Sequence, residues 1–103
     1  METAHFLKEG TLLSLSEQQL VDCSRLYGNE GCNGGEIYQA FEYAMNNAVT
    51  TEDKYPYTAE DDTCQKSIEG VVKLSTFDRV LDLASQFKAH LKENTISVAV
   101  QAD

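Results

Sequence analysis

The chain of 103 residues is long enough for one small domain, and its 42% hydrophobic content is ordinary for a globular protein and too high for a disordered one. Its 17 acidic residues outnumber its 8 basic ones, so the formal net charge of −9 argues against binding nucleic acid or an anionic membrane. No apolar run approaches the length that crosses a bilayer, and the charged N-terminal residues do not form a signal peptide.

The N-terminal part of the chain predicts two short helices. The first covers residues 2–9 and stops at Gly10, which adopts the left-handed conformation without strain. The second covers residues 17–23, where Ser16 is a favourable N-cap. Gln19 lies three residues after that cap, which is the spacing of a capping box.

The rest of the chain alternates loops with helical and extended segments. The expected elements are a glycine-rich loop (24–35), a helix (36–47), an irregular segment (50–64), a strand (70–74), a helix (82–93) and a β-branched strand (96–100). The acidic run at residues 60–62 lacks the alternating ligands and the glycine of a calcium loop, so we interpret it as solvated.

The glycines, cysteines and histidines form no recognisable cofactor or metal motif. The glycines of the 24–35 loop match neither the dinucleotide fingerprint nor a phosphate loop, and turns account for them. The cysteines include no C-x-x-C pair and lie far from both histidines in sequence, so we expect no metal site and no cofactor. His5 and His90 have lysine neighbours and are expected on solvated helix faces, not as catalytic bases.

Three cysteines leave one thiol without a partner in an oxidising compartment. Loop-closure entropy predicts a gain of about 4 kcal/mol for a Cys23–Cys64 bridge, slightly less for Cys32–Cys64 and about 3 kcal/mol for Cys23–Cys32. These values favour a disulfide, but the first two differ too little to choose between them.

Four motifs in a fixed order resemble the papain-like cysteine peptidases, and most of all their cathepsin L-type branch. The motifs are LSLSEQQLVDC, GCNGG, YPYTAEDDTC and ISVAV. The resemblance covers nearly the whole chain, from Glu2 to Ala102. It is highly specific, because few other families combine a capping-box helix that ends in Asp-Cys with a following Gly-Cys-Asn-Gly-Gly.

The resemblance implies an α+β fold. The family has a mostly helical left domain and a right domain that is a β-barrel, with the active-site cleft between them. Residues 1–69 would then be a partial left domain, and residues 70–103 the first strand, helix and strand of the barrel. The expected function is that of a fragment of a cysteine endopeptidase, a class that hydrolyses peptide bonds through a Cys–His pair.

The resemblance also assigns the cysteines and removes the catalyst from this chain. It pairs Cys23 with Cys64 and leaves Cys32 as an unpaired half-disulfide, whose usual partner precedes the catalytic cysteine. The family's nucleophile and oxyanion glutamine would lie before Met1, and its histidine and asparagine after Asp103. We therefore expect no catalytic residue in the chain.

Part of the substrate-binding wall is expected to remain. By resemblance, the backbone of Gly34 and Gly35 pairs with an extended peptide, and Gly35 is the principal partner. Ile37 would lie in the specificity pocket with Glu36 at its rim, and Ala99 would lie across the same pocket. Such an apolar floor suits a medium or large hydrophobic side chain, although Ile37 has the alternative of plain helix packing.

Two other functions are compatible with the sequence. The chain could be a catalytically dead pseudoenzyme or peptide-binding module, or a small acidic disulfide scaffold that contains a Cys23–Cys32 bridge. The family and its disulfide chemistry imply a lysosomal or extracellular location, in which case any targeting segment lies outside this chain. The expected partner of the full-length enzyme is a peptide or protein substrate.

Overall fold

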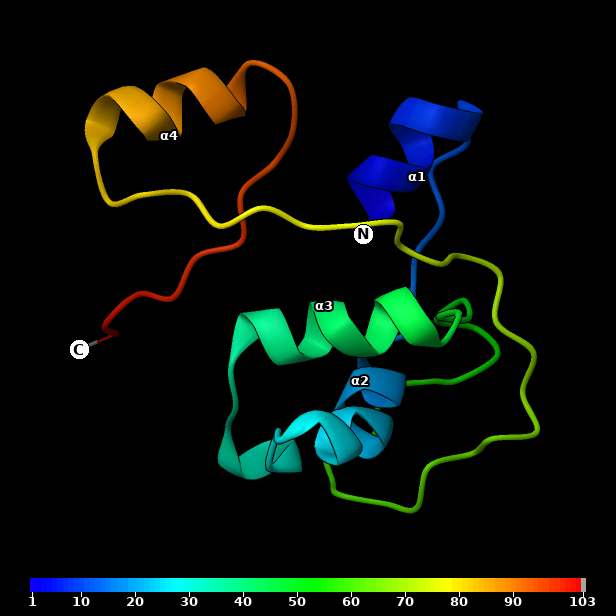
Figure 1. Ribbon diagram of the computed structural model, residues 1–103. Helices are drawn as coiled ribbons and strands as arrows, with labels where there is room; N and C mark the ends of the chain where they lie inside the picture. The colour runs from blue at the N-terminus through cyan, green and yellow to red at the C-terminus, as the bar shows by residue number, and fades with distance from the viewer. Residues whose placement is uncertain (103) are drawn as a thin grey trace.

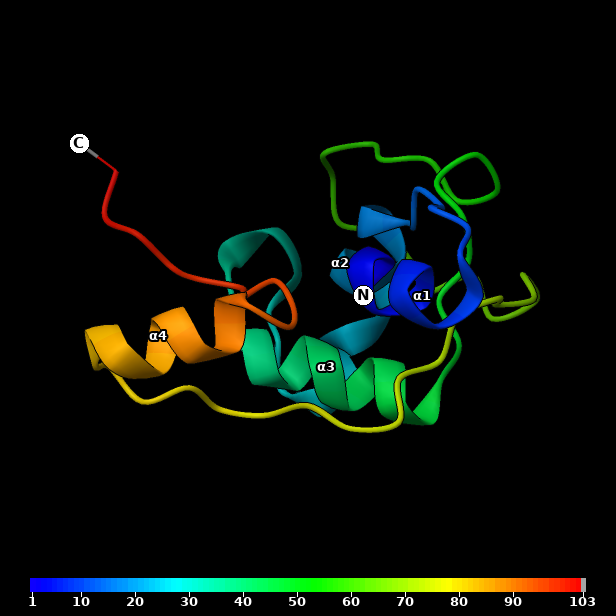
Figure 2. The same cartoon turned by 90° about the horizontal axis from the view of Figure 1, so that it is seen from above.

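The computed structural model describes residues 1–102, which are mostly helices and loops. The elements are α1 (Glu2–Glu9), α2 (Glu17–Cys23), the 3-10 helices η1 (Ser24–Tyr27) and η2 (Gly31–Asn33), α3 (Ile37–Asn46) and α4 (Ala84–Leu91). Helix α3 packs alongside α2 and η1, as Figure 1 shows. Helix α4 and the C-terminal segment lie to one side of this body in both views (Figures 1 and 2). None of the helices described is long and apolar enough to span a membrane.

The helices predicted at the N-terminus are confirmed. Helix α1 ends at Gly10, whose φ of 78° is the left-handed conformation that glycine tolerates. Helix α2 begins after Ser16, whose Oγ accepts a hydrogen bond from the Gln19 amide at 3.0 Å. Helix α2 buries several polar side chains, whereas α1 buries none.

The capping box is only half formed, because the Gln19 side chain is used elsewhere. Its Oε1 accepts a hydrogen bond from the Thr50 amide at 2.7 Å. Its Nε2 donates to the Tyr43 hydroxyl at 2.9 Å and to the Ala48 carbonyl at 3.0 Å. The Ser16 amide, which the box would have satisfied, donates instead to the Thr50 carbonyl. Gln19 therefore joins α2 to the segment that follows α3.

A second polar cluster joins α2 to the irregular segment at residues 55–65. The buried Asp22 carboxylate accepts hydrogen bonds from Gln18 Nε2 at 2.8 Å, from the Tyr55 hydroxyl at 2.7 Å and from the Asp62 amide at 3.1 Å. A disulfide links Cys23 to Cys64, across 41 residues of sequence, beside this cluster. The Cys23–Cys64 pairing is thereby confirmed, and the scaffold with a Cys23–Cys32 bridge is excluded.

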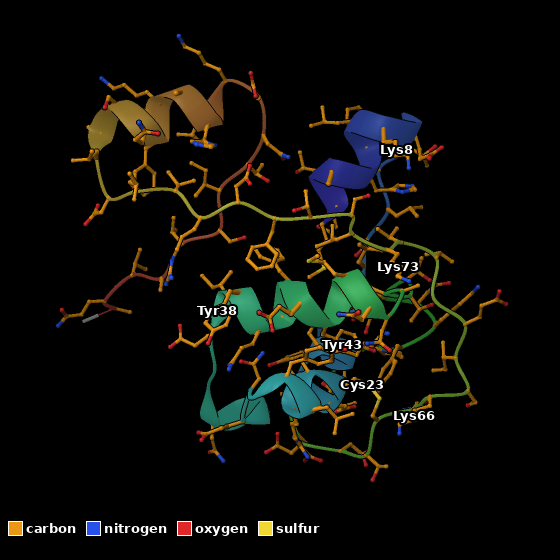
Figure 3. The ribbon with its side chains drawn as sticks, in the orientation of Figure 1. Lys8, Cys23, Tyr38, Tyr43, Lys66 and Lys73 are labelled. Carbon is orange, nitrogen blue, oxygen red and sulfur yellow. A yellow bond between two sulfur atoms is a disulfide. The ribbon has the colours of Figure 1, made fainter. Side chains whose placement is uncertain are left out.

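The hydrophobic core lies between α2, α3 and the two segments that follow α3. Its buried members are Leu15, Cys23, Tyr43, Ala44, Val49, Tyr55 and Val72. Tyr43 projects from α3 toward α2 in Figure 3 and makes an edge-to-face contact with Tyr27, with ring centroids 5.9 Å apart. Because Val72 is in this core, the start of the expected second domain packs directly on the first part of the chain.

The two predicted strands do not form. At residues 70–74 there is a single antiparallel bridge between Val49 and Val72, after which the Leu74 amide bonds to the carbonyl of Ala44 in α3. Residues 96–100 make no ladder with any other described segment. A strand is stable only when it pairs with a neighbouring strand. In the described part of this chain, residues 70–74 pair with another segment at one residue, and residues 96–100 pair with none.

Candidate functional site

The glycine-rich loop is held against the start of η1 by the side chain of Asn29. Its Nδ2 donates to the buried Ser24 hydroxyl at 2.9 Å, and its Oδ1 accepts from the Glu36 amide at 2.7 Å. The loop closes on itself through a bond from the Glu30 amide to the Gly34 carbonyl at 2.9 Å. Asn29 thus fixes the point at which the loop ends and α3 begins.

Gly34 and Gly35, two of the four glycines in this loop, are required for different reasons. Gly34 has a φ of 117°, a conformation that residues with a side chain rarely adopt, and open space lies where its Cβ would be. A Cβ on Gly35 would instead collide with the Asn29 carboxamide. A side chain at Gly35 would therefore displace the Asn29 side chain, which holds the loop in place.

The peptide groups of Gly35 are exposed and unused. Among the hydrogen bonds of residues 1–102, none involves the Gly35 amide or carbonyl. The glycine itself is exposed to solvent. An exposed donor and acceptor on one residue are the requirements for pairing with an added extended strand.

A hollow of about 260 Å³ lies next to these glycines. It is lined by Leu20, Val21, Ser24, Asn29, Gly31, Gly34, Gly35, Glu36, Ile37 and Ala40. Ile37 is 39% exposed and is outside the buried core, so it is a wall residue and not part of the helix packing. Tyr38, labelled in Figure 3, follows Ile37 at the N-terminal end of α3 and shows where this part of the helix lies.

The structure brings together four of the five predicted substrate-binding residues. Gly34, Gly35, Glu36 and Ile37 all line the hollow. Ala99 is exposed and is not among the lining residues, because the segment around it has no strand to hold it there. Sequence reasoning missed Asn29, although an asparagine between glycines is a recognisable loop-forming signal.

Cys32 lies at the far side of the same loop with its thiol free and exposed. Its amide donates to Asp61 Oδ1 at 2.8 Å, and the same oxygen pairs with Arg25 at 2.8 Å. Partial desolvation and then the Asp61 carboxylate raise the pKa of the Cys32 thiol, which is opposite to the activation that a nucleophile needs. The amide of Cys32 and the Arg25 guanidinium lower the pKa of Asp61.

Neither histidine belongs to this loop, and no metal centre is present among residues 1–102. His5 is on α1 and His90 is on α4, and neither lines the hollow. No three histidine, cysteine, aspartate or glutamate side chains in the described part of the chain are grouped so that they could hold a metal ion. The arrangement offers backbone hydrogen bonds and an apolar recess, which are binding features.

The chain is similar to cysteine proteases across its whole length. The family model described as papain family cysteine protease matches residues 1–103. Digestive cysteine proteinase 2 of Homarus americanus is 58% identical over 66 residues, which are 63% of this chain and 20% of that protein. Procathepsin L of Mus musculus is 44% identical over 107 residues, which cover 99% of this chain and 31% of that protein.

Solved structures agree with these sequence matches. The digestive procathepsin L 3 of Tenebrio molitor matches with a TM-score of 0.65 and 46% identity, over 69% of this chain and 24% of that one. The Carica candamarcensis protease CMS1MS2, solved in complex with E-64, has a TM-score of 0.84 and 30% identity, over 90% of this chain and 44% of that one. The chain therefore spans only a fraction of the length of these relatives, and it belongs to the papain family of cysteine proteases, in the cathepsin L-like branch.

Proposed function

We propose that this chain is a fragment of a papain-family cysteine endopeptidase and forms part of one wall of its peptide-binding cleft. Residues 1–69 would belong to the left domain and residues 70–103 to the start of the right domain. The chain covers 20% of the lobster proteinase and 31% of mouse procathepsin L, which leaves most of an enzyme to be supplied by other sequence.

The observation that carries this proposal is the unused backbone of Gly35. Its exposed amide and carbonyl have no partner among residues 1–102, and they border an apolar recess that includes Ile37. An extended peptide that pairs with Gly35 would place one of its side chains over that recess, because side chains alternate along a strand. Such a wall needs no cofactor and no metal.

The catalytic groups would come from the rest of the enzyme. The raised pKa of the Cys32 thiol and the positions of the histidines on α1 and α4 support this proposal, because a cysteine nucleophile needs a lowered pKa and a base beside it. The disulfide between Cys23 and Cys64 fits an oxidising compartment, and we propose a lysosomal or extracellular location.

Peptide pairing at Gly35 can be tested by titrating the chain with a capped, extended pentapeptide while its amide resonances are followed. We expect the resonances of Gly34, Gly35 and Glu36 to shift together. Methylation of the peptide nitrogen that faces Gly35 removes one hydrogen bond worth about 1 kcal/mol and should weaken binding roughly fivefold. The matched control carries the methyl group on the next nitrogen, which points away, and an equal loss from both would contradict the pairing.

A peptidase assay tests the assignment of the catalyst. We expect the chain alone to show no thiol-dependent cleavage of peptide substrates, and turnover that disappears in Cys32→Ser would overturn this. The neighbouring gene sequence separates a fragment from a free-standing peptide-binding module. In-frame codons for a Cys-Gly-Ser-Cys-Trp-like motif upstream, and for histidine- and asparagine-bearing segments downstream, are expected only for the fragment.

A further inference from the structure

We propose that the hollow beside Gly35 selects a peptide side chain with an apolar stem and a cationic end, which is lysine or arginine. This inference rests on the proposed function, because it names the class of peptide that the same wall would take. It replaces the purely hydrophobic preference that the pairing of Ile37 with Ala99 suggested, since Ala99 does not line the hollow.

The inner part of the hollow is apolar. Leu20 and Val21 from α2 and Ile37 and Ala40 from α3 line it. The two α2 residues are half-buried, and Ile37 keeps 39% of its surface exposed to solvent. A stem of methylene groups can cover such a surface while its charged end stays at the rim, as lysine and arginine side chains commonly do.

Among the described residues that line the hollow, exposed Glu36 carries a single uncompensated charge. Glu36 is the only charged residue among those that line the hollow. Its amide is held by Asn29, but its carboxylate has no ion pair or hydrogen bond with any other residue among 1–102. The nearby cation of Arg25 is already paired with Asp61 at 2.8 Å.

The wider field reinforces this local charge. The chain has a net charge of −9, and Glu30, within the glycine-rich loop, is also an exposed acid. A glutamate or aspartate on the peptide would therefore be repelled both at the rim and over a longer range. An aliphatic side chain would occupy the apolar part and leave the Glu36 carboxylate without a partner.

Three capped pentapeptides that differ only in the central residue test the proposal. The residue is lysine, its uncharged aliphatic analogue norleucine, or glutamate. Binding to the full 103-residue chain is followed by the amide shifts of Gly35 and Ile37 at low ionic strength. We expect the lysine peptide to bind about two- to fivefold more tightly than the norleucine peptide, which is the range of an exposed ion pair, and the glutamate peptide to bind most weakly.

Two variants distinguish a direct contact between the peptide cation and Glu36 from attraction by the net negative charge of the chain. Glu36→Gln should abolish the lysine advantage, whereas Glu30→Gln removes the same charge outside the hollow and should preserve most of it. Charge reversal by Glu36→Lys should make the glutamate peptide the preferred ligand. About 0.5 M salt should also remove the lysine advantage, because it screens exposed charges.

The outcomes distinguish this inference from the proposed function. If the lysine and norleucine peptides shift Gly35 with equal affinity, the wall binds peptides and only the cationic preference is overturned. The same holds if Glu30→Gln and Glu36→Gln have equal effects. If no peptide shifts the Gly35 amide, both the peptide-binding wall and the preference are overturned.

Discussion

Residues 15–72 and residues 75–102 of this chain contrast in how they are held. All the buried side chains among residues 1–102 lie in the first region, where they include the core tyrosines and the hydrogen-bonded polar residues of α2. No residue from 75 to 102 is buried, and the contacts between the two regions include the tilted rings of Phe77 and Phe41, whose centroids are 5.5 Å apart. Stability and structural definition should therefore be concentrated in the first region.

The comparison of α2 with α4 shows that buried polar side chains can hold a short helix in place even when the helix buries little apolar surface. Helix α2 has only seven residues, too few for a stable isolated helix, yet it buries Gln18, Gln19 and Asp22. Each of these side chains is hydrogen-bonded to a segment far away in sequence. Helix α4, of eight residues, has no such polar side chain and buries nothing.

The largest effect is expected from the disulfide. Cys23→Ser should lower the free energy of unfolding by about 4 kcal/mol, because the closed loop of 41 residues no longer limits the unfolded chain. Denaturant titration followed by far-ultraviolet circular dichroism measures this. Cys32→Ser is the matched control and should leave the midpoint nearly unchanged, since its thiol is free and exposed. Equal midpoints for both variants would contradict the importance of this link.

The next effect appears at alkaline pH through Tyr55. Desolvation, followed by the Asp22 carboxylate, raises the pKa of Tyr55 from 10.0 to about 12. The hydroxyl of Tyr55 therefore loses its proton at lower pH in the unfolded chain than in the folded one. Its contribution to the free energy of unfolding is fully present below pH 10 and is lost as the pH rises to about 12. The loss should reach up to about 3 kcal/mol.

The alkaline effect is measured as the difference between the unaltered chain and Tyr55→Phe in denaturant titrations from about pH 9 to 12. Both proteins should carry Cys32→Ser, so that no free thiolate attacks the disulfide. A parallel decline of stability in the two proteins would show that Tyr55 does not titrate as described.

Asp22→Asn should have an intermediate effect. The amide keeps an acceptor for Gln18 and the Asp62 amide, but its nitrogen cannot accept the hydrogen bond that the Tyr55 hydroxyl donates. We expect a loss of about 2 kcal/mol in the free energy of unfolding. Asp62→Asn is the control, because among residues 1–102 that carboxylate bonds only to the next amide in the chain, and its loss should cost less than about 0.5 kcal/mol.

The smallest effect is expected in the second region. Leu91→Ala removes a side chain that is 57% exposed and should change the free energy of unfolding by less than about 0.5 kcal/mol. Val49→Ala, at a buried position of the first region, should cost about 2 kcal/mol. If the two substitutions had similar effects, the contrast between the regions would fail.

Sequence reasoning succeeded where the signals were local. The cap at Ser16 and the left-handed stop at Gly10 depend on neighbouring residues, and both are present. It failed at residues 70–74 and 96–100, because β-branched residues favour an extended conformation but do not show whether a neighbouring strand is available for pairing. The Gln19 side chain was misassigned for a similar reason, since its actual partners are 24 to 31 residues away.

The sequence indicated which motif residues would form the candidate site, but it did not indicate that the charge of Glu36 would have no partner. The motif residues from Gly34 to Ile37 lie together because they are consecutive in the chain. The hollow also depends on Leu20 and Ala40, which reach it only through the packing of α2 against α3. That Glu36 lacks a counter-ion could not be read from the sequence, where Arg25 is equally available to it.

The contact between Gly35 and Asn29 makes these two positions a single unit for anyone who redesigns the wall. Gly35→Ala would require a smaller residue at position 29. That smaller residue would lose both hydrogen bonds of the Asn29 side chain, one with the Glu36 amide and one with the Ser24 hydroxyl. Substitutions at position 35 alone are therefore expected to distort the loop and not to change which peptide side chain is bound. Variation confined to Glu36 and Ile37 should change the ligand while it leaves the backbone in place.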